Sequence, residues 1–149
     1  LILMFIGGCA GSTACGIKIF RIQILFLFLI NQLKKIIYPR GIFLIKYDNN
    51  NVDDKFMASI ISFIYLYIII FFSITALLSL SGLDFITAIS GAATSISNVG
   101  PGLGSLIGPN GNFALLPDIS KWILSIGMIL GRLELFAILV LFLPSFWRN

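Results

Sequence analysis

The sequence predicts an all-α membrane protein, and three features point to this fold class. Of the 149 residues, 58% are hydrophobic and only 11% are charged, whereas soluble domains carry about a quarter charged residues. Residues 56–80 contain no charged side chain and are long enough as a helix to cross a hydrocarbon core of about 30 Å. Glycine-rich stretches interrupt the apolar segments at 7–16 and 97–102. We therefore expect the lipid bilayer to be the solvent of this chain.

The basic residues indicate how the chain is oriented. Lys and Arg flank the apolar segments around 31–55, but none occurs from residue 56 to residue 120. Because basic flanking residues stay on the cytoplasmic side, we expect 34–55 inside and 81–118 outside. The net charge is +4, but the basic residues are sparse and lie between apolar segments. No nucleic acid partner is expected.

Residues 1–33 predict a transmembrane helix that is broken in the middle. The stretch 7–16 reads GGCAGSTACG, which is a poor continuous helix, and a helix is expected over 17–33. Unwound backbone at membrane depth is tolerated only where protein buries it or water lines it. The alternative is an unbroken helix whose small residues pack against a neighbour, Gly7 with Gly11 and Ser12 with Gly16.

The segment 34–55 predicts a cytoplasmic connector. Pro39 should end the preceding helix at Tyr38, because proline disfavours a helical residue before it. Residues 42–47 then favour a short strand, with a turn at 49–51 and a returning strand.

Residues 56–145 predict a helix, a re-entrant loop and a second helix. The first helix covers 56–80, and Asp84 can cap a short helix within 84–97. That helix runs into a Gly/Pro loop at 97–102, and the last helix is expected over 119–145, with Asp118 or Ser120 as its cap. Residues 146–149 then form a cytoplasmic end.

The loop at 97–102 has the composition of an ion-binding backbone. A dehydrated cation can be bound by successive carbonyl oxygens of an extended chain, and glycine permits the strained conformations that this needs. Hydroxyl and amide side chains could support the loop. The alternative is an ordinary loop joining two helices. The supporting candidates are Thr94, Ser95, Ser97 and Asn98.

Arg132 lies near the centre of the last predicted helix. A charge there costs about 2.5–3.5 kcal/mol, so it should face protein or a wet cavity. We expect it to contact the broken segment 7–16, where a positive charge in a cation pathway would suit a gate. The alternatives are a structural ion pair or a side chain that reaches the interface. Glu134 lies two positions away and needs a different partner.

No set of catalytic residues is present in the sequence. The chain has no histidine, no nucleophile–base pair and no phosphate-binding loop. The two cysteines, Cys9 and Cys15, lack metal-site spacing and are read as small packing residues. We expect neither an enzyme nor an organic cofactor.

Three stretches together resemble a known family: residues 4–18, 95–104 and 121–148. They are similar to the C-terminal third of Trk/Ktr-type potassium uptake proteins, in particular the TrkH membrane subunit. The resemblance implies a four-repeat helix–pore loop–helix potassium transporter. This chain would carry the second helix of the third repeat (1–33) and the whole fourth repeat (56–145).

The resemblance also implies roles for individual residues, with potassium as the transported substrate. The filter residues would be Ser97, Asn98, Val99, Gly100 and Pro101, with potassium held by the backbone of residues 98–100. The gate would be formed by Gly7, Gly8, Gly11, Ser12, Thr13, Gly16 and Arg132. Family members usually have more glycine where this chain has Ala14 and Cys15, so the resemblance implies a stiffer gating loop in this chain.

The family's other properties imply the partners and location. We expect the missing repeats as part of a longer or split protein, a homodimer, a cytoplasmic nucleotide-binding regulatory subunit, and a multi-pass position in the inner membrane. Two rivals are a transporter whose discontinuous helix binds another solute, and a non-transporting truncated remnant.

Overall fold

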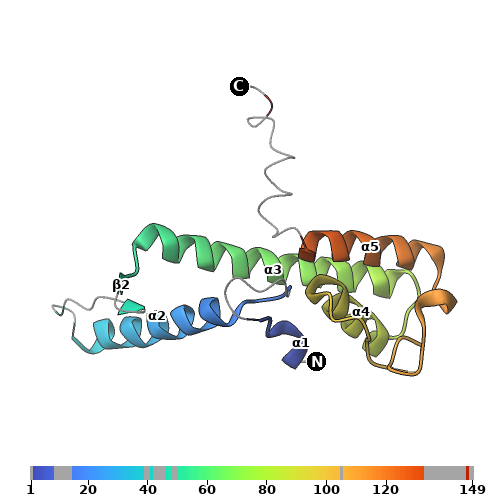
Figure 1. Cartoon of the computed structure of the whole chain (residues 1–149), viewed down its shortest axis with the longest axis horizontal. Coiled ribbons are helices and arrows are strands. Elements are labelled where there is room, and N and C mark those ends of the chain that lie inside the picture. Colours follow the sequence, from blue (N-terminus) through green and yellow to red (C-terminus); the bar gives the residue numbers. More distant parts are fainter. Residues whose placement is uncertain are drawn as a thin grey trace.

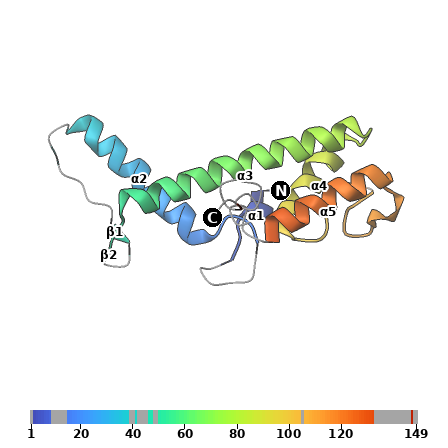
Figure 2. The ribbon, with the colours of Figure 1, turned by 90° about the horizontal axis from the view of Figure 1, so that it is seen from above.

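The computed structural model describes residues 2–8, 15–38, 41, 46–47, 50–104, 106–132 and 147. One long helix, α3, runs the length of the molecule, with α2 beside one half and α4 and α5 beside the other (Figure 1). Figure 2 shows the same division from above. The elements in chain order are α1 (Ile2–Phe5), α2 (Ile19–Ile37), β1 (Lys46–Tyr47), β2 (Asn50–Asn51), α3 (Asp54–Leu80), α4 (Phe85–Ser97), the 3-10 turn η1 (Phe113–Leu115) and α5 (Asp118–Arg132).

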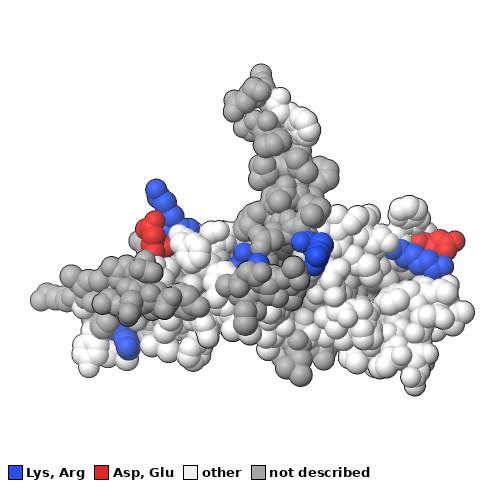
Figure 3. All heavy atoms as spheres, in the orientation of Figure 1, with Lys and Arg blue, Asp and Glu red and all other residues white. Residues whose placement is uncertain are grey.

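Helix α3 contains the predicted helix 56–80. Within the described part of the chain, its stretch Lys55–Leu80 is the one helix long and apolar enough to cross a membrane. Only 22% of its most apolar window is buried, so apolar side chains cover its outer surface. Figure 3 shows few charged side chains on the visible face, in small groups separated by uncharged surface. A helix that exposes this much apolar surface needs lipid or further protein around it.

The first apolar segment is interrupted where glycine predicted a break. Helix α1 ends at Phe5 and α2 begins at Ile19. The two ends of the interruption are joined by backbone hydrogen bonds, from the Gly7 N–H to the Ile17 carbonyl (3.0 Å) and from the Ile17 N–H to the Phe5 carbonyl (3.0 Å). These two hydrogen bonds therefore hold the end of α1 next to the residues that precede α2.

Helix α2 begins two residues after the start of the predicted range 17–33 and continues beyond it, to the end that Pro39 predicted, and the hairpin after it is shifted. The helix continues to Ile37, and the Tyr38 N–H donates to the Lys34 carbonyl (2.8 Å), which places the helix end just before Pro39. The predicted turn at 49–51 is wrong for its last two residues. Tyr47 pairs with Asn50 and Lys46 with Asn51, which leaves only residues 48–49 for the connection. Residues 42–45 of the predicted strand lie outside the described residues.

Helix α4 is buried along most of its length between α3 and α5. At 1.5 Å per residue it is about 20 Å long, too short to cross a core of about 30 Å. Asp84 occupies the N-cap position, although its side chain makes no capping hydrogen bond. The core beside α4 is formed by α3 and α5 side chains that include Ile74, Leu78 and Leu124.

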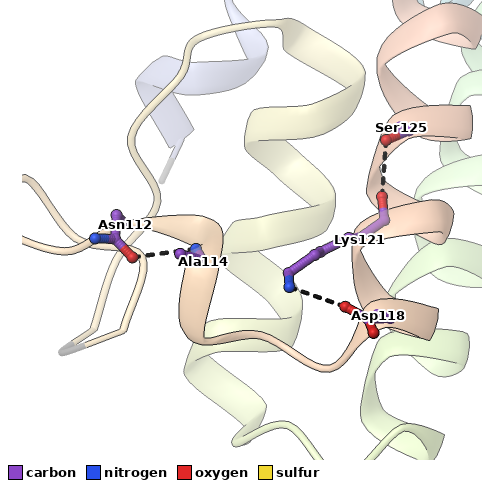
Figure 4. A network of polar contacts seen from close by, with 5 residues as sticks. All are labelled: Asn112, Ala114, Asp118, Lys121 and Ser125. Atoms are coloured by element: carbon purple, nitrogen blue, oxygen red, sulfur yellow. Dashed lines mark hydrogen bonds and ion pairs between the residues drawn. The ribbon is translucent and has the colours of Figure 1, made fainter.

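Helix α5 begins at Asp118, so the two predicted caps have other roles. Asp118 lies in the first turn and pairs with Lys121 (3.0 Å), while the Ser125 hydroxyl donates to the Lys121 carbonyl (2.8 Å) (Figure 4). The hydroxyl of Ser120 is buried and bonds to that of Ser81 at the end of α3 (2.8 Å). Of the predicted helix 119–145, residues 133–145 lie outside the described residues.

The η1 turn leads into α5 from the loop side. The Asn112 side chain accepts a hydrogen bond from the Ala114 N–H (3.1 Å) and so begins the turn (Figure 4). The buried side chain of Leu116 then packs into the core around α4. These contacts bring the chain back beside α4 after the loop at 97–104.

Candidate functional site

The chain turns sharply where α4 ends. Ser97 is the last helical residue, and Asn98 adopts a left-handed conformation with φ 51°. Gly100 has φ 106°, a conformation that other residues adopt only with strain. A side chain on Gly100 would meet nothing within 4 Å, so the backbone conformation, not lack of space, favours glycine there.

The backbone N–H groups after α4 are directed back at the helix. The Asn98 N–H donates to the Ser95 carbonyl (3.3 Å), and the Val99 N–H donates to the Thr94 carbonyl (3.2 Å). The Gly100 N–H donates to the Thr94 hydroxyl (2.9 Å). In a trans peptide the carbonyl points opposite to the N–H, and the described residues contain no cis peptide bond. The carbonyls of residues 97–99 are therefore directed away from α4.

A second hydroxyl of α4 holds the next part of the loop. The Leu103 N–H donates to the Ser90 hydroxyl (3.0 Å), and the Ser90 hydroxyl also lies 3.1 Å from the Leu103 carbonyl. Ser90 and Thr94 are fully buried and lie one turn apart on the same face of α4. The pair fixes the loop against the helix at two points, near Gly100 and at Leu103.

These contacts agree only in part with the supporting residues expected from sequence. Thr94 supports the loop as predicted, whereas the Ser95 hydroxyl donates to the Ala92 carbonyl of its own helix (2.9 Å). Ser90 was missed, although its spacing of four residues from Thr94 places both hydroxyls on one helix face and could have indicated it.

The side chains of Ser97 and Asn98 connect the end of α4 to both neighbouring helices. The Ser97 hydroxyl lies 2.8 Å from the hydroxyl of Tyr67 on α3. The Asn98 amide donates to the Met128 carbonyl on α5 (3.1 Å). Tyr67 was not predicted from the sequence, because a tyrosine inside an apolar helix carries no motif that distinguishes it from a packing residue.

The broken segment and the loop meet at one pocket of about 390 Å³. Two sets of residues that are distant in sequence therefore line the same space, and both contain predicted site residues. The lining residues are Met4, Ile6, Gly7, Gly8 and Cys15 from the first segment, and Ser97, Asn98 and Val99 from the end of α4 and the loop.

The glycines of the broken segment allow a close backbone approach. A side chain on Gly7 would lie 2.6 Å from the Cys15 carbonyl, and Gly16 has φ 92°. Across this segment, the Arg132 guanidinium nitrogen Nη1 lies 4.0 Å from the Cys15 sulfur. Arg132 thus reaches the broken segment from the described end of α5. Gly11, Ser12, Thr13, Cys9 and Glu134 lie outside the described residues.

The chemistry available at this site is that of neutral oxygen donors. Within the described ranges, no group of three or more His, Cys, Asp or Glu side chains could hold a metal ion. Backbone carbonyls of 97–99 and the nearby hydroxyls are the oxygen groups at the loop. Such donors suit a weakly bound monovalent cation better than a tightly held divalent metal.

Comparisons with known proteins give consistent matches over nearly the whole chain. A family model described as "TrkH: Cation transport protein" matches residues 1–149. The chain is 49% identical over 147 residues to the Trk system potassium uptake protein TrkI of Halomonas elongata, covering 99% of this chain and 30% of that protein. It is 38% identical over 145 residues to the Trk system potassium uptake protein TrkH of Salmonella typhimurium, covering 97% of this chain and 29% of that protein.

A solved structure has the same fold as this chain. The crystal structure of the potassium transporter TrkH from Vibrio parahaemolyticus matches with a TM-score of 0.88 and 35% sequence identity. The match covers 99% of this chain and 31% of that one. The chain therefore spans about a third or less of the length of the proteins that it resembles.

Proposed function

Because this chain belongs to the TrkH family of cation transport proteins, we propose that it forms one wall of a potassium pathway in a membrane transporter. Residues 97–101 are its filter segment, and potassium is bound by the backbone of residues 98–100. The relatives named potassium uptake proteins are about three times longer, so the remaining filter segments come from parts outside this chain.

The direction of the loop carbonyls is the observation that carries this proposal. The hydrogen bonds from Asn98, Val99 and Gly100 back to α4 turn the carbonyls of residues 97–99 away from the helix. Oxygens presented in this way can replace the water lost by a potassium ion. The carboxyl end of α4 also carries the negative end of the helix dipole, which favours a cation beside Ser97.

The proposed architecture assigns the elements to two repeats. Helices α1 and α2 form the broken second helix of the third repeat, and α3, α4, the loop and α5 form the fourth repeat. The fourth repeat has the order expected of helix, pore loop and helix. We propose a multi-pass inner-membrane transporter with the predicted connector 34–55, of which 38–53 lies between α2 and α3, in the cytoplasm. The transporter is assembled as a homodimer with a nucleotide-binding regulatory subunit.

The gate lies where the broken segment meets Arg132. The pocket between Gly7, Gly8 and the filter residues gives an ion a space on leaving the filter. The Arg132 guanidinium beside Cys15 places a positive charge close to this space. A fixed positive charge raises the electrostatic barrier for a cation, and moving it would lower that barrier.

The filter is tested by replacing Gly100 with alanine and comparing Gly82→Ala as the control. Both glycines have positive φ, 106° and 88°, and a side chain on either would meet nothing within 4 Å. Both substitutions therefore impose about 1–2 kcal/mol of similar backbone strain. We expect Gly100→Ala to lower the preference for potassium over sodium by about tenfold, which corresponds to about 1.4 kcal/mol, and Gly82→Ala to leave it unchanged.

The measurement is uptake by a complete transporter in cells that depend on it for potassium. The chain replaces the 147 aligned residues of the Halomonas elongata protein, which supplies the rest of the transporter. Potassium and sodium fluxes are compared at equal amounts of protein in the membrane. Equal ion preference in the Gly100→Ala and Gly82→Ala transporters would show that residue 100 is not part of a filter.

A further inference from the structure

We propose that Tyr67 is a positioning residue for ion selectivity, which acts by holding Ser97 through its hydroxyl group. The inference rests on the proposed function, because it takes residues 97–101 to be the filter segment. Tyr67 lies on α3, far from the loop in sequence, and its hydroxyl bonds to the side chain of Ser97. Its effect on the filter is transmitted by Ser97.

The hydroxyl pair lies in a closely packed part of the core. Tyr67 is 3% exposed and Ser97 is 5% exposed, and their hydroxyl oxygens lie 2.8 Å apart. A buried hydroxyl that loses its partner costs about 1–3 kcal/mol, so the two groups keep each other in place. The pair connects α3 to the last residue of α4.

Ser97 lies at a position where a small change in backbone conformation would alter the direction of a loop carbonyl. It directly precedes Asn98, whose left-handed conformation turns the chain into the loop. The carbonyl of Ser97 is the first of those directed away from α4. A bond that fixes the Ser97 side chain also restricts the peptide between Ser97 and Asn98, and with it the direction of that carbonyl.

The ring of Tyr67 has a separate role from its hydroxyl. It packs edge-on against Phe5 at the end of α1, with ring centres 6.1 Å apart, and in a tilted arrangement against Phe63, with ring centres 6.2 Å apart. The backbone carbonyl of Phe5 in turn accepts a hydrogen bond from the Ile17 N–H at the base of the broken segment. Replacing Tyr67 by phenylalanine keeps these ring contacts and removes only the contact to Ser97.

The experiment compares Tyr67→Phe with Tyr65→Phe in the complete chimaeric transporter described above. Tyr65 lies on the same helix but is 67% exposed, so its substitution removes a hydroxyl without touching α4. We expect Tyr67→Phe to lower the potassium over sodium preference by about threefold to tenfold, which corresponds to the net contribution of one hydrogen bond rather than to the full cost of an unpaired hydroxyl. Tyr65→Phe should leave the preference unchanged.

Ser97→Ala tests the same bond from its other end. It should lower the preference by a similar factor, and the double variant Tyr67→Phe/Ser97→Ala should be no worse than the poorer single variant, because both changes remove one shared contact. The amount of transporter in the membrane and its thermal unfolding are measured for each variant. If Tyr67→Phe fails to fold, the ion preference of Ser97→Ala decides the question.

The outcomes separate this inference from the proposed function. If Gly100→Ala lowers the ion preference but Tyr67→Phe and Ser97→Ala do not, the filter stands and the positioning role of Tyr67 is wrong. If none of the three changes the preference, the filter assignment itself fails. If Tyr67→Phe lowers only the maximal rate and leaves the preference intact, its role is structural and the proposal is overturned.

Discussion

Thr94 carries two of the three hydrogen bonds that set the direction of the loop. Its carbonyl accepts the Val99 N–H, and its hydroxyl accepts the Gly100 N–H. The first bond depends only on the backbone and survives any substitution at residue 94. The second depends on a side chain that is 1% exposed, so water cannot readily replace it. The orientation of the peptide between Val99 and Gly100 is therefore sensitive to this one hydroxyl.

Replacing Thr94 with valine should loosen the proposed filter segment with little change in the volume of the side chain. The lost acceptor leaves the Gly100 N–H without its partner, at a cost of about 1–3 kcal/mol. We expect a drop of at least about threefold in potassium over sodium preference, measured as competing uptake, while Thr94→Ser should retain most of it.

Thr75→Val is the matched control for this substitution. The Thr75 hydroxyl donates only to the Phe71 carbonyl of its own helix (2.8 Å). Its loss should leave ion preference unchanged. If Thr94→Val and Thr75→Val behave alike, the hydroxyl of Thr94 does not position the loop.

Two glycines of α5 allow this helix to approach α4 closely. A side chain on Gly127 would lie 2.8 Å from the Ser95 hydroxyl oxygen, and one on Gly131 would overlap the Ile96 carbonyl. The spacing of four residues places both on the same face of α5, the pattern of small residues that membrane helices use at close contacts. The contact at Gly131 lies beside the last turn of α4, so the helix pairing also fixes the start of the loop.

Gly131→Ala should destabilise the pairing of α4 and α5. The overlap with a backbone carbonyl can be relieved only by moving a helix, which costs about 1–3 kcal/mol. Thermal unfolding of the purified chimaeric transporter in detergent should show a lower midpoint than that of the unsubstituted protein.

Gly91→Ala provides the comparison within α4. A side chain there would make ordinary contacts of 3.4–3.6 Å with Ile107, Leu124 and Leu78. Its higher helix propensity should offset any small rearrangement, so we expect an unchanged or higher midpoint. A midpoint for Gly131→Ala that is not below that for Gly91→Ala would contradict the close contact.

At the scale of the whole molecule, the contact between Arg132 and the broken segment joins elements from opposite ends of the described chain. Arg132 is the last described residue of α5, and Cys15 precedes the start of α2. Their separation of 4.0 Å between Nη1 and Sγ places the guanidinium beside residues that line the pocket below the loop. A movement of either element would change the charge near that pocket.

Arg132→Ala should increase potassium flux when the transporter is otherwise closed. Removing the positive charge lowers the barrier to a cation, and we expect about a tenfold rise, equivalent to about 1.4 kcal/mol. The measurement is basal potassium efflux from cells that contain the chimaeric transporter.

Lys121→Ala serves as the control on the same helix. Lys121 lies near the other end of α5 and pairs with Asp118. Its removal should leave the basal flux unchanged. An equal rise for both variants would point to general destabilisation, and no rise for Arg132→Ala would remove this residue from the gate.

The membrane class and the positions of the main elements followed from local features of the sequence. The long uncharged run was predicted to be a membrane helix because the bilayer core penalises charge, and α3 contains this run. Clustered glycine disfavours a continuous helix, and this located the break between α1 and α2. Proline placed the end of α2, since it restricts the residue before it. These are local effects, and they can be read from neighbouring residues.

The contacts between distant residues were instead set by the packing of the helices against one another. The bonds of Tyr67 to Ser97 and of Asn98 to Met128 depend on how α3, α4 and α5 cross. The same holds for the pocket that unites the broken segment with the loop. A hydroxyl in an apolar helix has the same local sequence whether it faces lipid, its own backbone or another helix. Its partner is set by long-range packing, which no local pattern records.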